Sequence, residues 1–522
     1  MIRVNRATDA RKGRGPAPSF FVLRPCALAL LAALLVPLFS APPLRAATYD
    51  PETLDSETGD QFLQIAPPKS APMREILGLI EAGRPDAAIA RLRAEIAEGR
   101  DGPVVQELLG IAHAKLGEIE KSLAAFRAAL ALDPESPSAH TNMALVLKAI
   151  GRIGAAESHF RKALALDPED RRAHQNLGLI AEARGDVAAA ITHFEAGLRG
   201  TSPGYLGVKL DLARLYLAQN RPEDVLALLG NWGTDPRAPE SVALLLARAH
   251  MALNAPEKAR ALLAPRLENA KSPAPFIELA RMAMAGRDFE SAEALLARAD
   301  AAFPGDAQIA FERGNLKGAM RRYEEALAFY GKGLADSPRN PALLHAAAIA
   351  SQRLGRLGDA LAYARKAHAA DPGNAGTLLL IATISERRGQ TQDAIDAYEK
   401  ALLLAPESWL VRNNLAALLT PRDPARAVAL ARKAVAASGG KEEVRDTLGW
   451  ALFQAGQGEE AREIFERLAG ENPENAKAFF RLGMILKAEG DTAGARRALE
   501  RALALAPEAS FAPQAEKALA DQ

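Results

Sequence analysis

The sequence predicts an all-α solenoid built from stacked two-helix repeats. A pattern of small, apolar and aromatic residues returns every 33 to 34 residues between Lys69 and Ala509, about 13 times. Each copy contains two stretches with helical spacing of apolar residues, and each stretch is short for a helix that must be stable alone. A period of this length is typical of repeats that bury their apolar faces against their neighbours.

The repeat is clearest in three consecutive copies, which start at Pro103, Pro137 and Arg171 and align without gaps. Small residues at positions 8 and 20 let the two helices of a copy approach closely, and Gly at position 15 permits the turn between them. Phe at position 24 fills the remaining space. Several later copies have Pro at position 32, which ends the second helix because Pro lacks a backbone donor. The residues concerned are Gly110, Ala144 and Gly178 at position 8, Gly117, Gly151 and Gly185 at position 15, Ser122, Ala156 and Ala190 at position 20, and Phe126, Phe160 and Phe194 at position 24.

With these positions the chain resembles the tetratricopeptide repeat (TPR) family, whose 34-residue unit has small residues at 8 and 20, an aromatic at 24 and Pro at 32. The resemblance covers residues 69–509 and implies a right-handed superhelical solenoid of about 13 helix-turn-helix repeats. The family's frequent Trp at position 4 is replaced by His140, His174 or Phe479. We expect residues 510–522 to form the capping segment that the end of a solenoid needs.

The first 46 residues have the layout of a secretory signal peptide. A basic leader precedes an apolar run from Cys26 to Phe39, and Leu44, Arg45 and Ala46 then form a cleavage motif. Fourteen apolar residues are short for a membrane-spanning helix, which needs about 20. We therefore expect cleavage after Ala46, with a retained N-terminal membrane anchor as the alternative, and a flexible spacer over residues 47–68.

Cleavage would change the charge of the chain. Residues 1–46 hold seven of the 65 Lys and Arg residues and one of the 64 Asp and Glu residues, so the remainder has a net charge of about −5. This balance argues against nucleic acid as a partner. The leader also holds Cys26, the only cysteine, and a mature chain without cysteine suits an oxidising compartment. We expect secretion across the inner membrane to a bacterial periplasm, with no membrane insertion after cleavage.

An enzymatic function is not expected. The sequence has no phosphate-binding glycine loop, no HExxH motif, no cysteine pair and no nucleophile elbow, and repeats occupy nearly all of the mature length. His140 and His174 recur at position 4, and His159 and His193 at position 23. This spacing is the repeat period, which favours packing or surface positions over a metal site. The sequence thus predicts no catalytic residue, no metal and no cofactor.

The family resemblance implies that the first helix of each repeat lines a concave, peptide-binding groove, chiefly through positions 2, 5, 6, 9, 12 and 13. These positions hold polar residues in the early repeats and three arginines in succession at position 9: Asn142, Asn176, Arg214, Arg248, Arg281 and Asn315. Guanidinium groups suit carboxylates, so a partner with acidic side chains or a free C-terminus is one prediction. The alternative is that these arginines pair with nearby acids such as Asp211, Glu278 and Glu312.

Aromatic residues occupy the same positions near the C-terminus. Trp450 and Phe453 stand at positions 9 and 12 of one repeat, and Phe480 at position 5 of the next. They predict an anchor pocket for a partner helix. The alternative is that Trp450 packs under residues 510–522.

The sequence therefore predicts a non-catalytic scaffold or adaptor that binds protein or peptide partners. The segments Asn413–Ala416 and Asp446–Trp450 are similar to the closing repeats of bacterial cell-envelope TPR proteins that accompany polysaccharide export or exosortase-linked systems. A periplasmic carbohydrate-binding or polymer-binding solenoid and a self-assembling structural protein are the alternatives. The oligomeric state does not follow from the sequence.

Overall fold

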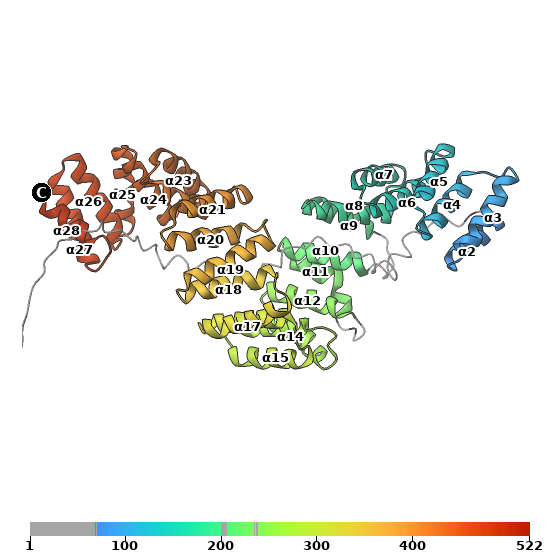
Figure 1. Cartoon of the computed structure of the whole chain (residues 1–522), viewed down its shortest axis with the longest axis horizontal. Coiled ribbons are helices and arrows are strands. Elements are labelled where there is room, and N and C mark those ends of the chain that lie inside the picture. The colour runs from blue at the N-terminus through green and yellow to red at the C-terminus, as the bar shows by residue number, and fades with distance from the viewer. Residues whose placement is uncertain (1–67, 69, 200–205, 234, 236–237, 522) are drawn as a thin grey trace, which may run out of the picture. The chain divides into compact units, whose positions relative to one another are not determined.

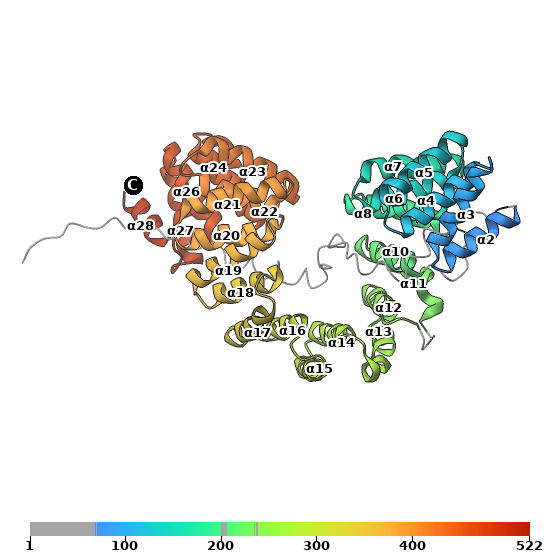
Figure 2. The same cartoon turned by 45° about the vertical axis from the view of Figure 1, so that its right-hand side comes forward.

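The computed structural model describes residues 68, 70–199, 206–233, 235 and 238–521. The signal peptide and the spacer predicted for residues 1–68 lie outside this part, except for Pro68. The described residues contain 27 α-helices and two short 3-10 helices and no strand. Consecutive helices pack as antiparallel pairs (Figure 1; Figure 2). The prediction of an all-α solenoid of about 13 two-helix repeats is confirmed.

Contacts divide the chain into two units, with the boundary between Met282 and Ala283. The N-terminal unit contains α2 Ala71–Glu81, α3 Pro85–Ala97, α4 Pro103–Lys115, α5 Ile119–Leu132, α6 Pro137–Ala149, α7 Ile153–Leu166, α8 Arg171–Ala183, α9 Val187–Gly197, α10 Leu206–Ala218, α11 Pro222–Leu229, η3 Gly230–Trp232, α12 Glu240–Ala252, α13 Pro256–Leu263, η4 Ala264–Asn269 and most of α14 Ala274–Ala285.

The C-terminal unit contains α15 Phe289–Ala302, α16 Ala307–Ala319, α17 Tyr323–Asp336, α18 Pro341–Arg353, α19 Leu357–Ala370, α20 Ala375–Arg387, α21 Thr391–Leu404, α22 Trp409–Leu419, α23 Pro424–Ser438, α24 Glu442–Gln454, α25 Gly458–Glu471, α26 Ala476–Glu489, α27 Thr492–Leu505 and α28 Ala512–Ala520. In both units even-numbered helices are the first helices of their repeats and odd-numbered helices the second, and α28 follows the last repeat.

Some helices begin where a side chain satisfies free backbone amides. Asp170 accepts hydrogen bonds from the amides of Arg172 and Ala173 at the start of α8, and Asn340 does the same at the start of α18. Such caps stabilise a helix by about 0.5–2 kcal/mol. In these two repeats the residue before the first helix therefore helps to fix where the helix begins.

The turn between the two helices of a repeat requires a left-handed backbone. Gly117, Gly151 and Gly185 adopt φ of 71°, 74° and 79° at this point. In four consecutive repeats the residue at this point is not glycine. These residues are Asn220, Asn254, Arg287 and Arg321, and they adopt the same left-handed backbone with φ of 55–60°. Asn tolerates this conformation better than Arg does. Position 15 therefore keeps its geometry even where the expected glycine is missing.

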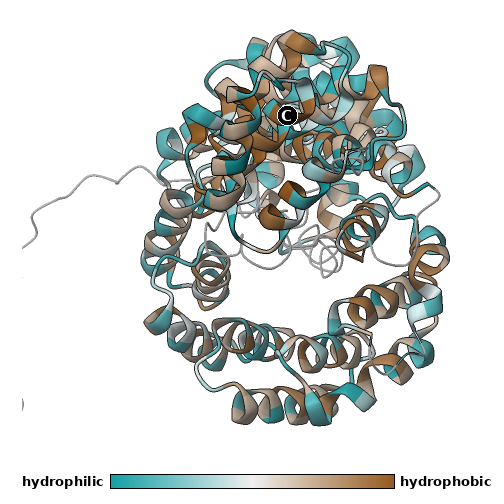
Figure 3. Ribbon diagram, turned by 90° about the vertical axis from the view of Figure 1, so that its right-hand side faces the viewer, coloured by the Kyte–Doolittle hydropathy of each residue, from teal (hydrophilic) through white to brown (hydrophobic). Residues whose placement is uncertain are grey.

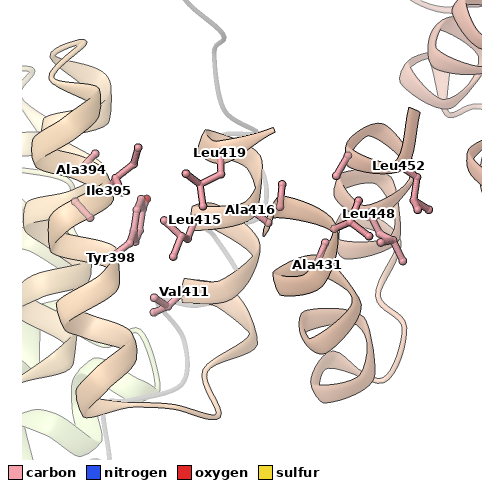
Figure 4. Close-up of a cluster of buried hydrophobic side chains, with 14 of the residues drawn as sticks. Ala394, Ile395, Tyr398, Val411, Leu415, Ala416, Leu419, Ala431, Leu448 and Leu452 are labelled. Carbon is pink, nitrogen blue, oxygen red and sulfur yellow. The ribbon is translucent and has the colours of Figure 1, made fainter. Parts of the chain in front are cut away.

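In several repeats the core is an aromatic ring against a small residue. Phe126, Phe160 and Phe194 are fully buried, and a Cβ added to Gly178 would lie 2.6 Å from Cε1 of Phe194. Aliphatic side chains then join successive repeats, as in the cluster around Tyr398 (Figure 4). Hydrophobic and hydrophilic residues share the same helices (Figure 3), so the stability of each helix depends on the apolar side that it buries.

Candidate partner-binding face

First helices of neighbouring repeats contact one another in rows. These contacts join α2, α4 and α6, and α10 and α12, in the N-terminal unit; in the C-terminal unit they join α16, α18 and α20, and α22, α24 and α26. The residues predicted to bind partners all lie on first helices, with Asn176 on α8 and Arg281 on α14 outside these rows. We call the side of each row that carries repeat positions 2, 5, 6, 9, 12 and 13 the first-helix face.

Asn142 and Asn176, both predicted to bind partners, are buried in a polar network. The Asn142 amide donates to Glu107 Oε1 at 3.0 Å, and its oxygen accepts from Arg172 Nη1 at 3.0 Å. The Asn176 amide donates to the Arg172 carbonyl at 2.8 Å, and its oxygen accepts from Lys148 Nζ at 2.6 Å. Both asparagines are at most 1% exposed. They join three repeats to one another.

This network, which we call the Glu107 network, places charges in a buried setting. Glu107 also accepts from Ser138 Oγ at 3.0 Å. Burial raises the pKa of Glu107 above its usual value, although both hydrogen bonds and the charge of Arg172 oppose the rise. Burial likewise lowers the pKa of Lys148. Hydrogen bonds at both ends of Asn142 and Asn176 offset part of the cost of burying these polar groups.

The three predicted arginines are each paired with an acid and each partly exposed. Arg248 donates from Nε and Nη2 to the two carboxylate oxygens of Glu278, at 3.2 and 3.1 Å. Arg281 Nη1 lies 3.6 Å from the same carboxylate, and Arg214 pairs with Asp211 on its own helix. The side chains of Arg214, Arg248 and Arg281 are 48%, 40% and 28% exposed. Pairing with Asp211 and Glu278, the alternative for these arginines, is therefore present, and the three side chains are still partly exposed.

Asn315 belongs to the C-terminal unit, whereas the three arginines belong to the N-terminal unit. Its amide donates to Glu312 Oε2 at 3.3 Å, and its oxygen accepts from the Tyr330 hydroxyl at 2.9 Å. Asn315 thus orients the aromatic ring at position 24 of its own repeat.

The aromatic residues near the C-terminus divide into two groups. The rings of Trp450 and Phe453 lie 5.2 Å apart, and both side chains are half-buried on α24. Phe480 is 6% exposed and stacks at 4.8 Å on Phe511, which directly precedes α28. The residue found to pack under the C-terminal segment is thus Phe480. Of the three predicted aromatic residues, Trp450 and Phe453 are partly exposed.

Two cations beside Trp450 were not predicted from the sequence. The guanidinium carbon of Arg481 lies 4.9 Å from the Trp450 ring centre, and Arg481 Nη1 lies 2.8 Å from Asp446 Oδ2. Lys477 Nζ lies 2.7 Å from the same oxygen. One carboxylate therefore faces two cations beside a half-buried aromatic pair. The signal in the sequence is the placement of Asp446 about one repeat before the two basic residues.

The eight histidines include four that meet in pairs, His140 with His159 and His174 with His193. Within the described residues no group of three or more His, Cys, Asp or Glu side chains is placed to hold a metal ion. In the same part of the chain, no helix combines the length and the apolar character that a membrane span requires.

Stacked helix pairs with a repeated small-and-aromatic core define the class of helical-repeat proteins. Tetratricopeptide repeat models match residues 141–205, 379–442 and 447–510, a further tetratricopeptide repeat model matches 181–238, and a TPR repeat model matches 110–151. These segments are tetratricopeptide repeats.

Solved structures resemble the chain at low identity. The crystal structure of yeast Tom70 is 17% identical, with 80% of this chain and 96% of that chain covered and a TM-score of 0.33. The APC/C hetero-tetramer Cut9-Hcn1 is 13% identical over 88% and 92% of the two chains, with a TM-score of 0.42. YrrB, described as a TPR protein with an unusual peptide-binding site, is 23% identical over 36% and 97%, with a TM-score of 0.32. None of the curated proteins compared with the chain matches it.

Proposed function

We propose that the protein is a non-catalytic scaffold that binds protein or peptide partners on its first-helix faces. The observation that supports this most is the pattern of exposure. Buried networks join neighbouring repeats, while Arg214 and Arg248 in the N-terminal unit and Trp450 and Phe453 in the C-terminal unit remain partly exposed. Paired and partly exposed arginines suit acidic partner segments, and half-buried aromatic rings suit an apolar anchor residue.

The two units offer two different chemistries. The arginines of the N-terminal unit would bind carboxylates, and the Trp450–Phe453 pair of the C-terminal unit would bind an apolar side chain next to Arg481. A single long partner or two separate partners would both use these surfaces.

The place of action that we propose is the periplasm, in export or assembly of an envelope polysaccharide. It rests on the predicted signal peptide of residues 1–46 and on the similarity of Asn413–Ala416 and Asp446–Trp450 to envelope TPR proteins. Cell fractionation and N-terminal sequencing of the mature chain would test the location. A mature chain that begins at Ala47 supports cleavage, and a chain that keeps residues 1–46 supports the membrane anchor.

The binding test uses the full chain and two site variants as bait for envelope proteins. One variant changes Arg214, Arg248 and Arg281 to Glu, and the other changes Trp450 and Phe453 to Ala. The matched control changes three other paired and exposed arginines to Glu, namely Arg356, which directly precedes α19, Arg365 on α19 and Arg432 on α23. We expect the site variants to lose partners that the control keeps. Equal retention by all four baits would contradict binding on the first-helix faces.

A further inference from the structure

Two histidine pairs connect the first and second helices of two successive repeats. His140 on α6 and His159 on α7 approach with their Nδ1 atoms 2.9 Å apart, and His174 on α8 and His193 on α9 with theirs 3.1 Å apart. The ring centres lie 5.2 and 5.4 Å apart, so in each pair the two Nδ1 atoms point at one another. Each pair is therefore a direct nitrogen-to-nitrogen hydrogen bond.

Backbone carbonyls determine which ring donates. His140 Nε2 lies 3.2 Å from the Pro134 carbonyl, and His174 Nε2 lies 3.0 Å from the Pro168 carbonyl. A carbonyl oxygen only accepts, so Nε2 of each of these rings carries the proton. In a neutral ring Nδ1 is then the acceptor. His159 and His193 must donate from Nδ1 to complete the pairs.

Each histidine pair can take up only one extra proton without losing its hydrogen bond. With one added proton the hydrogen bond can persist. His140 then carries protons on both nitrogens and donates from Nδ1, and His159 carries its proton on Nε2 and accepts at Nδ1. A second added proton leaves N–H groups and positive charges facing each other at both Nδ1 atoms, which removes the hydrogen bond and adds repulsion. The same count applies to His174 and His193.

The surroundings oppose added charge. Burial lowers the pKa of His140, His159 and His193 below the usual 6.5. The charge of Lys162 on α7 lowers it further for His140 and His159, and that of Arg161 on α7 does so for His193. Arg161 and Arg184 both pair with Glu157, which lines the same small hollow as His193. These cations, together with nitrogens that point at each other, also disfavour a divalent metal between the rings.

We propose that the two histidine pairs form an acid-sensitive latch, which holds α6 against α7 and α8 against α9 and opens when each pair takes up a second proton. A histidine whose pKa is lowered by folding binds protons more weakly in the folded state than in the unfolded one. Its contribution to stability is therefore complete above about pH 6.5 and is lost as the pH falls below that value. This latch does not depend on the proposed scaffold function.

Hydrogen exchange of the full chain between pH 7 and pH 5, corrected for intrinsic exchange, tests the latch. Helices α22 to α27 contain no histidine and serve as the internal reference. We expect protection in α6 to α9 to fall about tenfold more than in the reference. Equal losses in the two regions of the unmodified chain would overturn the proposal.

Two variants assign the effect to the pairs. In H159Q/H193Q the glutamine side chains can still hydrogen-bond to His140 and His174 but cannot take up a proton. We expect the excess loss of protection in α6 to α9 to disappear. The control is H345Q, which removes another histidine whose pKa is lowered by burial. An excess that persists in H159Q/H193Q, or that H345Q also abolishes, would contradict the latch.

Discussion

Replacing Gly314 by Ala tests the close fit between a small residue and an aromatic ring within one repeat. A Cβ at Gly314 on α16 would lie 2.2, 2.5 and 2.8 Å from Cε1, Cδ1 and Cζ of Tyr330. Carbon atoms normally approach to about 3.5–4.0 Å, so the ring would have to move by more than about 1 Å. Tyr330 is only 5% exposed, and its hydroxyl donates to Asn315 at 2.9 Å. Little free space is left for the ring.

The magnitude follows from two opposing effects. Overpacking a core costs about 1–3 kcal/mol. Ala stabilises a helix interior by up to about 1 kcal/mol relative to Gly. Gly318 on the same helix is the matched control, because the nearest atom to its added Cβ is the Tyr330 hydroxyl oxygen at 3.9 Å. G318A should therefore stabilise α16 slightly, and G314A should lie about 1–3 kcal/mol below it.

Hydrogen exchange in α16 and α17, together with urea unfolding of the full chain, measures this difference. The double variant G314A/Y330L should recover most of the loss, because the two residues are in contact and their effects are not additive. Equal protection of α16 and α17 in G314A and G318A would refute the packing argument. So would a loss in G314A that Y330L does not relieve.

Two further predictions concern the N-terminal unit. Changing Phe160 to Ala should cost about 3–5 kcal/mol of local stability, because the ring is fully buried, and hydrogen exchange in α6 and α7 would show it. Changing Glu107 to Gln should alter the pH dependence of stability. The pKa of Glu107 is raised by burial, so its contribution is complete below about pH 4.5 and is lost as the pH rises through the folded-state value. Urea midpoints measured from pH 4 to pH 8 should lack this loss in E107Q, and an unchanged profile would count against a buried, charged Glu107.

Sequence reasoning predicted the helix pairs because local patterns determine them. Position 24 is buried in Phe126, Phe160 and Phe194, and position 15 has positive φ even where it is Asn220 or Arg321. These features depend on contacts within one repeat, which recur in many of the copies. The division after Met282 was not predicted, since it depends on how densely successive repeats contact one another.

The candidate site was harder to predict, because repeat positions identify a face of the helix but not the partners on it. Asn142 occupies a position that the family uses for ligands, yet it binds Glu107, 35 residues earlier, and Arg172, 30 residues later. Arg248 and Glu278 are also 30 residues apart. Pairs of complementary polar residues separated by about one repeat were the available signal. Such pairs indicate hydrogen bonds between neighbouring repeats and do not by themselves indicate a ligand.

This distinction separates the predicted residues that are buried in contacts between repeats from those that are partly exposed. Asn142, Asn176 and Phe480 could contact a ligand only if bonds between repeats or the packing of Phe480 on Phe511 were broken, and buried polar groups without partners are costly. Trp450 and Phe453 need no such rearrangement, because part of each ring already faces solvent. An acidic group of a partner next to Trp450 would compete with Asp446 for Arg481, whereas an apolar group would not. An apolar anchor at Trp450 would thus need no such competition, whereas a partner carboxylate at Arg214 or Arg248 would share the guanidinium group with Asp211 or Glu278.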